Sequence, residues 1–294
     1  MCWCECVQIL CKAMSVLISF IIPYHNEPQW MLDECIASIE ALDLLPDEYE
    51  VLVEHDVEDE GPSLTRNRAI EKARGEYIQF VDCDDRLFPA SYARIIAFVR
   101  EKRMDMLMFR FSSTDRERVG RNGLSRRWNG AEFLVHNNLR AGTCMYVFKR
   151  EVLGDLRFCP DIFHEDTLFT PLLIMRAKSL YVVKERAYFY RQHEGTTMSN
   201  RNRGFVERRL NDAIVVLRTL RAERERAGGI AVRALRRVID QQVMSLLIMV
   251  HQAGMGVAGL RRYASILRKE GFMPLPLHCY NWKYYIFALV SRVL

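Results

Sequence analysis

Three carboxylates within four residues follow a short apolar run in the stretch Gly75–Asp85. Tyr77–Val81 is typical of a strand buried in a sheet, and Asp82, Asp84 and Asp85 come where that strand must stop. In an open α/β sheet, ligands gather outside the carboxyl ends of the strands. Acids spaced Asp-x-Asp at such a place can present hard oxygen ligands to Mg²⁺ or Mn²⁺. A solvated turn is the alternative, because Asp is common in turns.

Two other polar loops follow predicted strands earlier in the chain. Val16–Ile22 is almost continuously apolar and β-branched, as in a strand covered on both faces, and Pro23 is predicted to end it. The polar loop Tyr24–Pro28 comes next. Glu50–Glu54 predicts a second strand, and its exit, Glu54–Asp56, is acidic. Polar side chains therefore follow three successive strands.

Segments with helical periodicity separate these strands. Apolar residues recur at helical spacing in residues 29–42 and again in residues 64–74. Strand, helix, strand, helix and strand in that order imply parallel strands with right-handed crossovers. Parallel strands end at the same edge of a sheet, so the loops 24–28, 54–62 and 82–85 converge there. That arrangement is suited to holding a nucleotide.

The chain up to about residue 200 continues the alternation of strands and helices. The elements expected there are a helix at 91–102, a strand at Met104–Phe111, an exposed Arg-rich loop at 112–130, a strand at Met145–Phe148, a helical turn at 149–153, a helix at 166–177 and a strand at Leu180–Val183. Glu165 and Asp166 lie at the start of the helix 166–177, where acids complement the helix dipole, so a capping role alone is one alternative. From residue 204 onward the periodicity is helical.

The C-terminal tail is aromatic and apolar over Trp282–Val290, with Lys283 and Arg292 beside the apolar residues. This composition suits a helix that lies in a membrane interface, and packing onto its own domain is the alternative. No stretch of the sequence reaches the roughly 20 apolar residues that a spanning helix needs. The apolar run Val16–Pro23 is too short for a signal peptide and lacks a small-residue cleavage site.

Composition and missing motifs exclude several classes of function. The net charge of +5 is mild for 294 residues, so it does not indicate a nucleic-acid binder. No Gly-x-Gly-x-x-Gly follows the first strand, which argues against a nicotinamide or flavin enzyme, and there is no Gly-Lys-Ser/Thr P-loop. Four of the nine Cys fall within the first eleven residues and the others are scattered singly. They form no disulfide framework and indicate a reducing cytosol.

Taken together, these segments resemble a family 2 glycosyltransferase of the GT-A fold, over roughly residues 15–200. The resemblance rests on the order and spacing of four motifs, which are Phe20–Glu27, Arg66–Ala69, Gly75–Asp85 and Glu165-Asp166. It implies an α/β protein with a Rossmann-like, mostly parallel sheet flanked by helices. The domain boundaries expected are a disordered leader at 1–14, the GT-A domain at 15–200 and a helical C-terminal region at 201–294 that contacts a membrane or a partner.

The activity implied by the resemblance is transfer of a sugar from a nucleotide-diphosphate-sugar to an acceptor hydroxyl, with inversion of the anomeric centre. By motif, Asp84 would hold the Mg²⁺ or Mn²⁺ that bridges the diphosphate, Asp82 would hold the ribose region, and Asp166 would be the general base. Such an ion stabilises the leaving diphosphate as a Lewis acid, and a carboxylate within reach takes the proton of the acceptor hydroxyl. Glu165 is adjacent to Asp166, but successive side chains on a helix seldom share a face, which favours Asp166 alone.

Further motif residues are assigned to the nucleotide-sugar by the same resemblance. Those expected to line or approach the nucleotide are Pro23, His25, Asn26, Glu27 and Arg66. At the exit of the second strand the family usually reads Asp-Asp-Gly-Ser, whereas this chain reads Glu54–Asp59. Either Glu54 or Asp56 contacts the base, and the sequence leaves both alternatives open.

Arg191 follows an aromatic run that matches the Tyr-x-Tyr-Arg stretch of the family. With Thr196 and Thr197 it is expected to close over the diphosphate as a mobile flap, and a surface ion pair is its alternative. His164 and His193 are candidate ligands of a metal or a phosphate, although a lone His is more often structural.

Two rival functions stay open. A nucleotidyltransferase also joins nucleotide diphosphates and metals on such a sheet, but it usually opens with a Gly-rich basic loop, which Pro23–Pro28 does not resemble. A non-catalytic relative that binds a nucleotide or a partner is the second, and the intact Asp84 and Asp166 argue against it. The partners implied are a nucleotide-diphosphate-sugar donor, preferably a UDP-sugar, and a glycan or lipid-linked acceptor, with no nucleic acid. The setting implied is polysaccharide or glycolipid synthesis in the cytoplasm, at the inner face of the plasma membrane.

Overall fold

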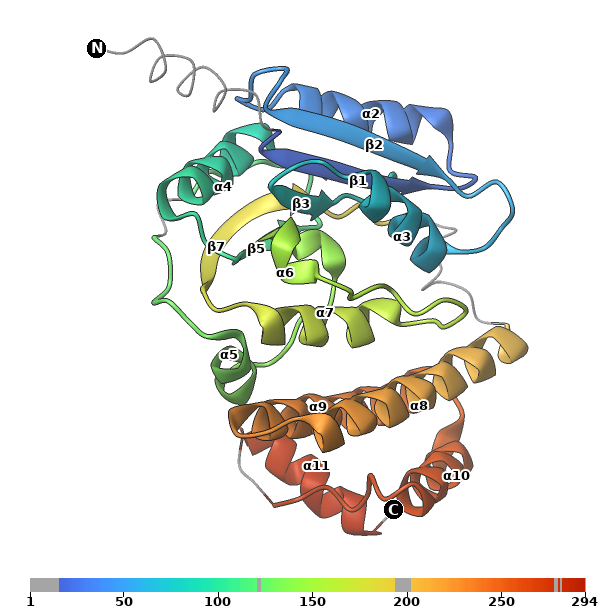
Figure 1. Cartoon of the computed structure of the whole chain (residues 1–294). Helices are drawn as coiled ribbons and strands as arrows, with labels where there is room; N and C mark the ends of the chain where they lie inside the picture. The colour runs from blue at the N-terminus through green and yellow to red at the C-terminus, as the bar shows by residue number, and fades with distance from the viewer. Residues whose placement is uncertain (1–15, 121–122, 194–201, 278–279, 281, 294) are drawn as a thin grey trace. The chain divides into compact units, whose positions relative to one another are not determined.

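The computed structural model describes residues 16–293, with the exception of positions 121–122, 194–201, 278–279 and 281 (Figure 1). The leader expected at 1–14 and the residues Thr196 and Thr197 of the expected flap lie outside the described residues. The chain divides into two compact units. The first comprises Met1–Gly130, Gly142–Asp161 and Leu172–His193, and the second comprises Ala131–Ala141, Ile162–Pro171 and Glu194–Leu294.

A mixed sheet forms the centre of the first unit, and its α/β architecture is the predicted fold class (Figure 1). Its strands are β1 (Ile18–Tyr24), β2 (Tyr49–His55), β3 (Tyr77–Phe80), β4 (Arg86–Leu87), β5 (Met106–Ser112), β6 (Tyr146–Lys149) and β7 (Leu180–Phe189). They lie in the order β2-β1-β3-β6-β5-β7-β4. The pairs β1–β2, β1–β3 and β5–β7 are parallel, as expected for the first three strands, whereas β6 is antiparallel to both of its neighbours. The sheet is therefore parallel where it supports the polar loops and mixed beyond them.

Pro23 lies inside β1 and does not end it, which corrects the predicted boundary. The strand continues to Tyr24 and pairs with β2 through Pro23↔Glu54 and Tyr24↔His55. On the other side of β1, the last ladder bond is donated by the Val81 backbone to the Ile21 carbonyl, beyond the end of β3. The missing N–H of proline points to that side, where no partner strand remains, so proline costs no ladder hydrogen bond there.

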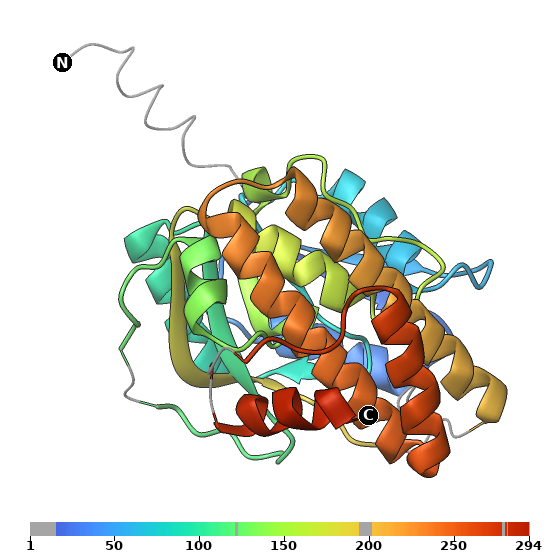
Figure 2. The same cartoon turned by 90° about the horizontal axis from the view of Figure 1, so that it is seen from below.

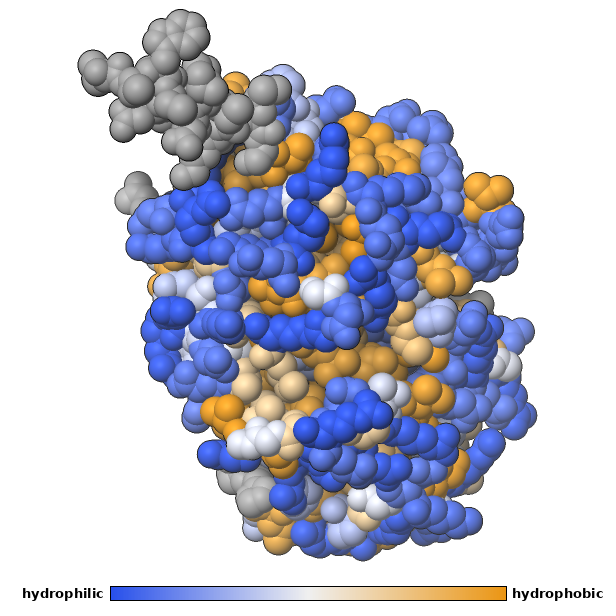
Figure 3. All heavy atoms as spheres, viewed as in Figure 1, coloured by the Kyte–Doolittle hydropathy of each residue, from blue (hydrophilic) through white to orange (hydrophobic). Residues whose placement is uncertain are grey.

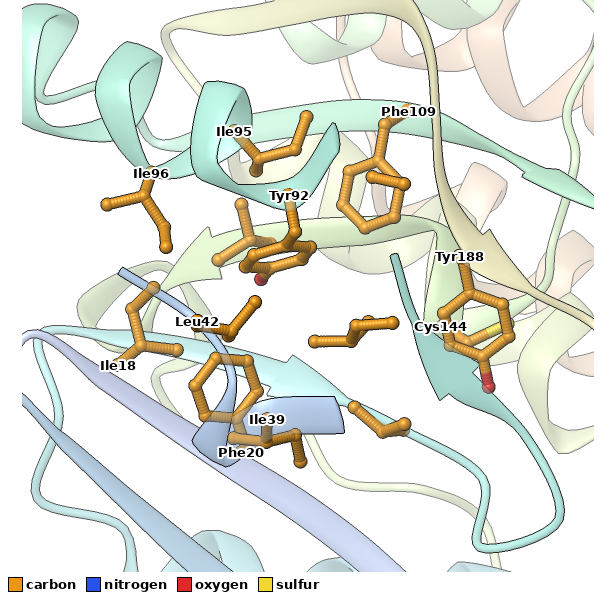
Figure 4. Packing of buried hydrophobic residues seen from close by; sticks show 14 of the residues in the cluster. Ile18, Phe20, Ile39, Leu42, Tyr92, Ile95, Ile96, Phe109, Cys144 and Tyr188 are labelled. Atoms are coloured by element: carbon orange, nitrogen blue, oxygen red, sulfur yellow. The ribbon is translucent and has the colours of Figure 1, made fainter. Parts of the chain in front are cut away.

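Helices cover both faces of this sheet. In the first unit these are α2 (Gln29–Glu40), α3 (Pro62–Lys72), α4 (Pro89–Lys102) and α6 (Arg150–Leu153), with the 3₁₀ turn η1 (Thr143–Met145). Inward side chains of α2 and α4 pack on one face of the sheet in a single apolar cluster (Figure 4). The strands supply alternate residues to that cluster, as Ile18, Phe20 and Ile22 do in β1. Burial of these period-two side chains fixes the register of the strands.

The second unit is helical. Its elements are α5 (Gly130–His136), the start of α7 (Glu165–Arg176), α8 (Arg203–Arg226), α9 (Ile230–Gln252), α10 (Gly256–Lys269) and α11 (Trp282–Val293). The long helices α8 and α9 run side by side, and α10 packs against α9 (Figure 2). Each buries one apolar face, as the predicted periodicity required. Among the described helices, none combines the length and the apolar character needed to cross a membrane.

Candidate functional site

Three loops of the first unit meet at the carboxyl edge of β1, β2 and β3, as predicted. The register pairs Tyr24 with His55, so the loops that leave β1 and β2 start side by side. The backbone N–H of Asp56 donates to the Tyr24 carbonyl at 2.8 Å and extends that pairing into the loop. The acidic loop Asp82–Asp85 leaves β3, which pairs with the other side of β1. The parallel pairing of β1 with both neighbours is what brings the three loops together.

A pocket of about 410 Å³ opens between the first two of these loops. Its lining residues are His25, Asn26, His55, Asp56, Val57 and Asp59. The Asp56 side chain is only 6% exposed, and its two carboxylate oxygens accept the backbone N–H groups of Glu60 at 2.9 Å and Gly61 at 2.8 Å. Asp56 therefore fixes the loop that enters α3 and at the same time forms part of the pocket wall.

Hydrogen bonding fixes the tautomer of His25 in this pocket. Its Nδ1 lies 3.1 Å from the Asp56 carbonyl oxygen, which can only accept, so Nδ1 carries the proton. Its Nε2 lies 2.7 Å from the Asn26 amide nitrogen, which can only donate, so Nε2 accepts. The His25 side chain is 38% exposed at the pocket.

Glu54 and Asp56, the two alternatives for contact with a base, have different surroundings. Asp56 lines the pocket, whereas the Glu54 carboxylate binds the α3 cations Arg68, at 3.0 Å, and Lys72. Burial raises the pKa of Glu54, but the hydrogen bonds from Lys72 and Arg68 outweigh it and hold that pKa below its ordinary value. Asp56 therefore lies at the pocket, whereas Glu54 joins β2 to α3.

The first two acids of the loop after β3 have different partners. Asp82 accepts from the guanidinium of Arg66 at 2.9 Å, and the Arg66 side chain is 8% exposed and lies over the Phe158 ring. Asp84 has its Oδ2 at 2.9 Å from Nε2 of His193, and both side chains are about a quarter exposed. Burial, with the charge of Asp82 beside it, raises the pKa of Asp84 above its ordinary value. Asp82 thus forms an ion pair with an arginine, whereas Asp84 contacts an imidazole.

The third acid, Asp85, holds the end of β7 against the acidic loop. Its Oδ2 accepts from the Tyr188 hydroxyl and its Oδ1 from the Arg191 backbone N–H, both at 2.7 Å. The Tyr188 oxygen accepts in turn from the Asp82 backbone N–H at 3.1 Å. The Tyr188 ring lies beside Cys144 at one end of the apolar cluster (Figure 4). Burial and the charges of Asp82 and Asp84 raise the pKa of Asp85 to about 8.

We expect Tyr188→Phe to lower the free energy of unfolding by about 1–3 kcal/mol, because it leaves the buried Asp85 oxygen and the Asp82 N–H without their shared partner. Urea unfolding followed by circular dichroism measures this loss. Tyr49→Phe is the matched control, since the Tyr49 ring packs edge-on against Phe20 and is kept. An equal loss in both variants would contradict the role given to the Tyr188 hydroxyl.

Arg191 is tied to the acidic loop and to α2. Its Nε donates to the Asp84 carbonyl oxygen at 2.8 Å, and its guanidinium also binds the Glu34 carboxylate. The same guanidinium lies 5.2 Å from the centre of the Trp30 ring, within the range of a cation–π contact. Trp30 is 54% exposed. An arginine and an exposed aromatic ring therefore lie at the rim of the acidic loop.

Asp84 and His193 form a donor pair that suits a divalent ion. A carboxylate oxygen and an imidazole nitrogen 2.9 Å apart are both ligands of Mn²⁺, whereas Mg²⁺ prefers oxygen. His25, Asp56 and Asp59 are a further group with ligand atoms close together. Both Asp56 oxygens already accept backbone N–H groups, so that group is the poorer candidate.

Asp166 lies in the first turn of α7, in the part of that helix that belongs to the second unit. The residue two positions before it, His164, has φ of +67°, a left-handed conformation, and its carbonyl accepts the Thr167 N–H and hydroxyl. These two bonds form the turn that starts the helix. Burial, reinforced by the positive charge of Arg209, lowers the pKa of His164 to about 4, although Asp212 acts in the opposite direction.

We expect His164 to make stability depend on pH below neutrality. Because its folded pKa is depressed, the unfolded chain takes up the proton first, and the stabilisation present above about pH 6.5 is lost as the pH falls toward 4. Between about pH 7 and pH 4.5, the free energy of unfolding should fall about 2 kcal/mol further in the wild type than in His164→Asn. Asn tolerates the left-handed backbone, so the variant tests the titration alone. Parallel pH profiles in chemical unfolding would contradict it.

The structure brings together most of the residues that the sequence singled out, within the first unit. These are Pro23, His25, Asn26, Glu27, Asp56, Arg66, Asp82, Asp84 and Arg191, all in or beside the three loops. Trp30, Glu34 and Tyr188, to which the sequence analysis gave no role, also belong to this cluster. So do Asp85 of the acidic run and the candidate ligand His193. Asp85 could be found from the sequence because it belongs to the acidic run. The other residues contact partners that are distant along the chain, and no sequence pattern pointed to those contacts.

Part of the chain is similar to a known protein family. Residues 43–153 match the model "Glycosyl transferase family 2". An uncharacterized glycosyltransferase of Escherichia coli, YibD, is 28% identical over 49% of this chain and 45% of its own length. The poly(ribitol-phosphate) beta-N-acetylglucosaminyltransferase TarS of Staphylococcus aureus is 23% identical over 62% of this chain and 37% of its own length. The chain thus spans less than half the length of these curated relatives.

A solved structure shares the fold over most of the chain. The crystal structure of residues 1–349 of Staphylococcus aureus TarS in complex with UDP-GlcNAc superposes with a TM-score of 0.60 and 20% identity, covering 93% of this chain and 80% of that one. At this identity the match is one of fold. Residues 43–153 are thus similar to glycosyltransferase family 2, and the chain shares the GT-A fold of the TarS structure.

Proposed function

We propose that the protein is an inverting glycosyltransferase that moves a sugar from a nucleotide-diphosphate-sugar to an acceptor hydroxyl. The proposal rests on one observation. The acidic loop after β3 and the pocket lined by His25 and Asp56 lie at the same edge of the sheet. The pocket is of a size to accept a base, and the loop offers carboxylates on the same edge for the diphosphate and its cation. TarS, which has the same fold, was crystallised in complex with UDP-GlcNAc, and this supports a UDP-sugar as the donor.

Different residues of the first unit would bind different parts of the donor. Asp56 and His25 would bind the base, and the Arg66–Asp82 pair would hold the ribose region, with Asp82 oriented by its 2.9 Å bond to Arg66. Asp84, with His193, would hold Mg²⁺ or Mn²⁺, which supplies a Lewis acid for the leaving diphosphate. Arg191 would leave Glu34 for a phosphate oxygen, because guanidinium binds both anions in the same bidentate way.

Asp166 would serve as the general base. Its carboxylate would accept the proton of the acceptor hydroxyl as that oxygen attacks the anomeric carbon, and attack on the face opposite the diphosphate inverts the centre. Support comes from the residue type and from its place in a Glu-Asp pair at the start of a helix. General bases of this kind contribute about 10²–10⁴ to the rate.

The acceptor is proposed from the relatives. TarS is named for poly(ribitol-phosphate), and GgaB of Bacillus subtilis, 26% identical over 46% of this chain, is a minor teichoic acid biosynthesis protein. We propose a cell-surface glycan or lipid-linked glycan as the acceptor, with synthesis on the cytoplasmic side of the plasma membrane. The excess of Arg in the C-terminal region is compatible with an anionic glycan.

A panel of nucleotide-sugars tests this function. The protein is incubated with UDP-, GDP- and other nucleotide-sugars, with Mn²⁺ and with a chelator, and release of the nucleoside diphosphate is measured. We expect slow hydrolysis of one donor class, which depends on the metal because a diphosphate beside several carboxylates needs a cation to offset their repulsion. Release of inorganic pyrophosphate from a nucleoside triphosphate and a sugar phosphate would instead identify a nucleotidyltransferase. Nucleotide binding that calorimetry finds unaffected by Mn²⁺, without turnover, would identify a non-catalytic relative.

A further inference from the structure

One face of α11 carries large apolar side chains that lie in water. The residues on this face, called here the α11 outer face, are Trp282, Tyr285, Ile286, Leu289, Val290 and Val293. Their exposed fractions run from 42% for Tyr285 to 89% for Val293. The spacing of three and four residues places them along one side of the helix. A continuous apolar row of this kind is costly in water and usually marks a contact surface.

The opposite side of α11 is already used for packing within the second unit. Its buried residues are Tyr284, Ala288 and Ser291. The Ser291 hydroxyl accepts the Leu275 N–H at 3.0 Å, and the Ser291 carbonyl accepts from the Arg268 guanidinium at 3.0 Å. These bonds hold the helix in a fixed rotation about its axis. The outer face therefore cannot turn inward without breaking them.

The C-terminal region around this helix is strongly basic. Residues 201–294 contain 17 Lys and Arg against six Asp and Glu, a net charge of +11, whereas residues 1–200 contain 25 against 31, a net charge of −6. On α11 itself, Lys283 and Arg292 flank the apolar row and are exposed, and the Lys283 amine lies 5.6 Å from the Trp282 ring. The surface seen in Figure 3 is largely hydrophilic, with smaller apolar areas between. On α11, basic residues therefore lie on both sides of an exposed apolar row.

We propose that the α11 outer face inserts into the interface of an anionic lipid bilayer. Trp and Tyr favour the depth of the headgroups, Ile, Leu and Val favour the acyl boundary below, and Lys and Arg bind anionic headgroups. A second copy of the chain is the poorer occupant, because pairing two outer faces would bring two regions of +11 together without a compensating charge. This contact does not depend on the proposed function, since it involves neither the donor nor the acidic loop.

Vesicle co-sedimentation of the full chain tests the proposal. Vesicles of phosphatidylcholine alone are compared with vesicles that contain phosphatidylglycerol. We expect binding to the anionic vesicles at least about tenfold tighter than to the neutral ones, and weaker binding at high salt, because each Lys or Arg near an anionic surface contributes about 1 kcal/mol. The double variant Ile286→Glu, Leu289→Glu should lose on the order of 100-fold in affinity, about tenfold for each buried side chain removed.

The matched control is Leu45→Glu, Val119→Glu, which changes two exposed apolar residues of the first unit and should bind as the wild type does. Unfolding midpoints of both variants check that each is folded. A second measurement uses the fluorescence of Trp282, which brominated lipid should quench in the wild type, with that part of the quenching lost in Trp282→Phe. The proposal is overturned if the wild type and the double variant bind anionic vesicles equally, or if the wild type does not bind them. If the wild type does not bind vesicles but is a dimer, and the double variant is a monomer, the α11 outer face binds a second copy of the chain.

Discussion

Asp166→Asn is expected to lower kcat for sugar transfer by about 10³-fold while the dissociation constant of the donor changes by less than about threefold. An amide has nearly the shape of the carboxylate but cannot take a proton, so the substitution removes the base and little else. Asp166 lies in the first turn of α7, where an acid also stabilises the helix end, but that effect is only about 0.3–1 kcal/mol. Steady-state kinetics gives the first quantity, and calorimetry with the nucleoside diphosphate and Mn²⁺ gives the second.

Glu165→Gln is the control for this experiment, because Glu165 has the same charge, is the neighbour of Asp166 and lies in the same helical turn. Its kcat should stay within about threefold of the wild type, since consecutive helical side chains point about 100° apart. If Asp166→Asn weakens donor binding as much as it lowers kcat, Asp166 contacts the donor and is not the general base. A larger effect of Glu165→Gln would exchange the two roles.

Asp84→Asn is expected to weaken Mn²⁺-dependent binding of a nucleoside diphosphate by at least about 10–100-fold, the loss typical even of groups that only orient a metal ligand. The change removes the carboxylate that lies 2.9 Å from His193 and leaves the pocket of His25 and Asp56 in place. Binding without metal should therefore change little. Calorimetric titrations with and without Mn²⁺ separate the two contributions.

Asp59→Asn is the matched control, because Asp59 belongs to the other group of potential metal ligands and its side chain is 88% exposed. We expect its metal-dependent binding to equal that of the wild type. A titration that Asp84→Asn leaves unchanged would remove the metal role of Asp84. If only Asp59→Asn loses metal-dependent binding, the ion binds at the group of His25, Asp56 and Asp59 instead.

Much of the first unit could be predicted from the sequence, because local patterns carry the information. The apolar runs of β1, β2 and β3 and the helical spacing of α2 and α3 indicated the order of elements, and that order dictates parallel pairing. Parallel pairing in turn places the loops 24–28, 54–62 and 82–85 on one edge. The boundary at Pro23 was wrong because local propensity does not reveal that β3 stops early and leaves the side of Pro23 that faces it without a partner.

The partners of the site residues could not be predicted in the same way. Glu54 and Asp56 are equally acidic and only two residues apart, yet one binds Arg68 and Lys72 and the other lines the pocket. His193 was one of two candidate ligands for which a structural role was thought more common, since a single His carries no spacing signal, and it lies 2.9 Å from Asp84. Contacts between residues about 100 positions apart depend on how the chain returns to the sheet.

The amino-acid sequence alone determines which groups occur and where along the chain: an Asp-x-Asp run after a buried strand, a Glu-Asp pair at a helix start, and an aromatic, basic tail. Residue type and periodicity are local properties, and neighbouring residues are enough to reveal them. Tertiary packing, in contrast, establishes that Tyr188 and Arg191 hold Asp85, that His193 faces Asp84, and that one side of α11 stays in water. Those outcomes depend on which distant groups share a buried space, because a buried polar atom takes whichever partner the packing brings within reach.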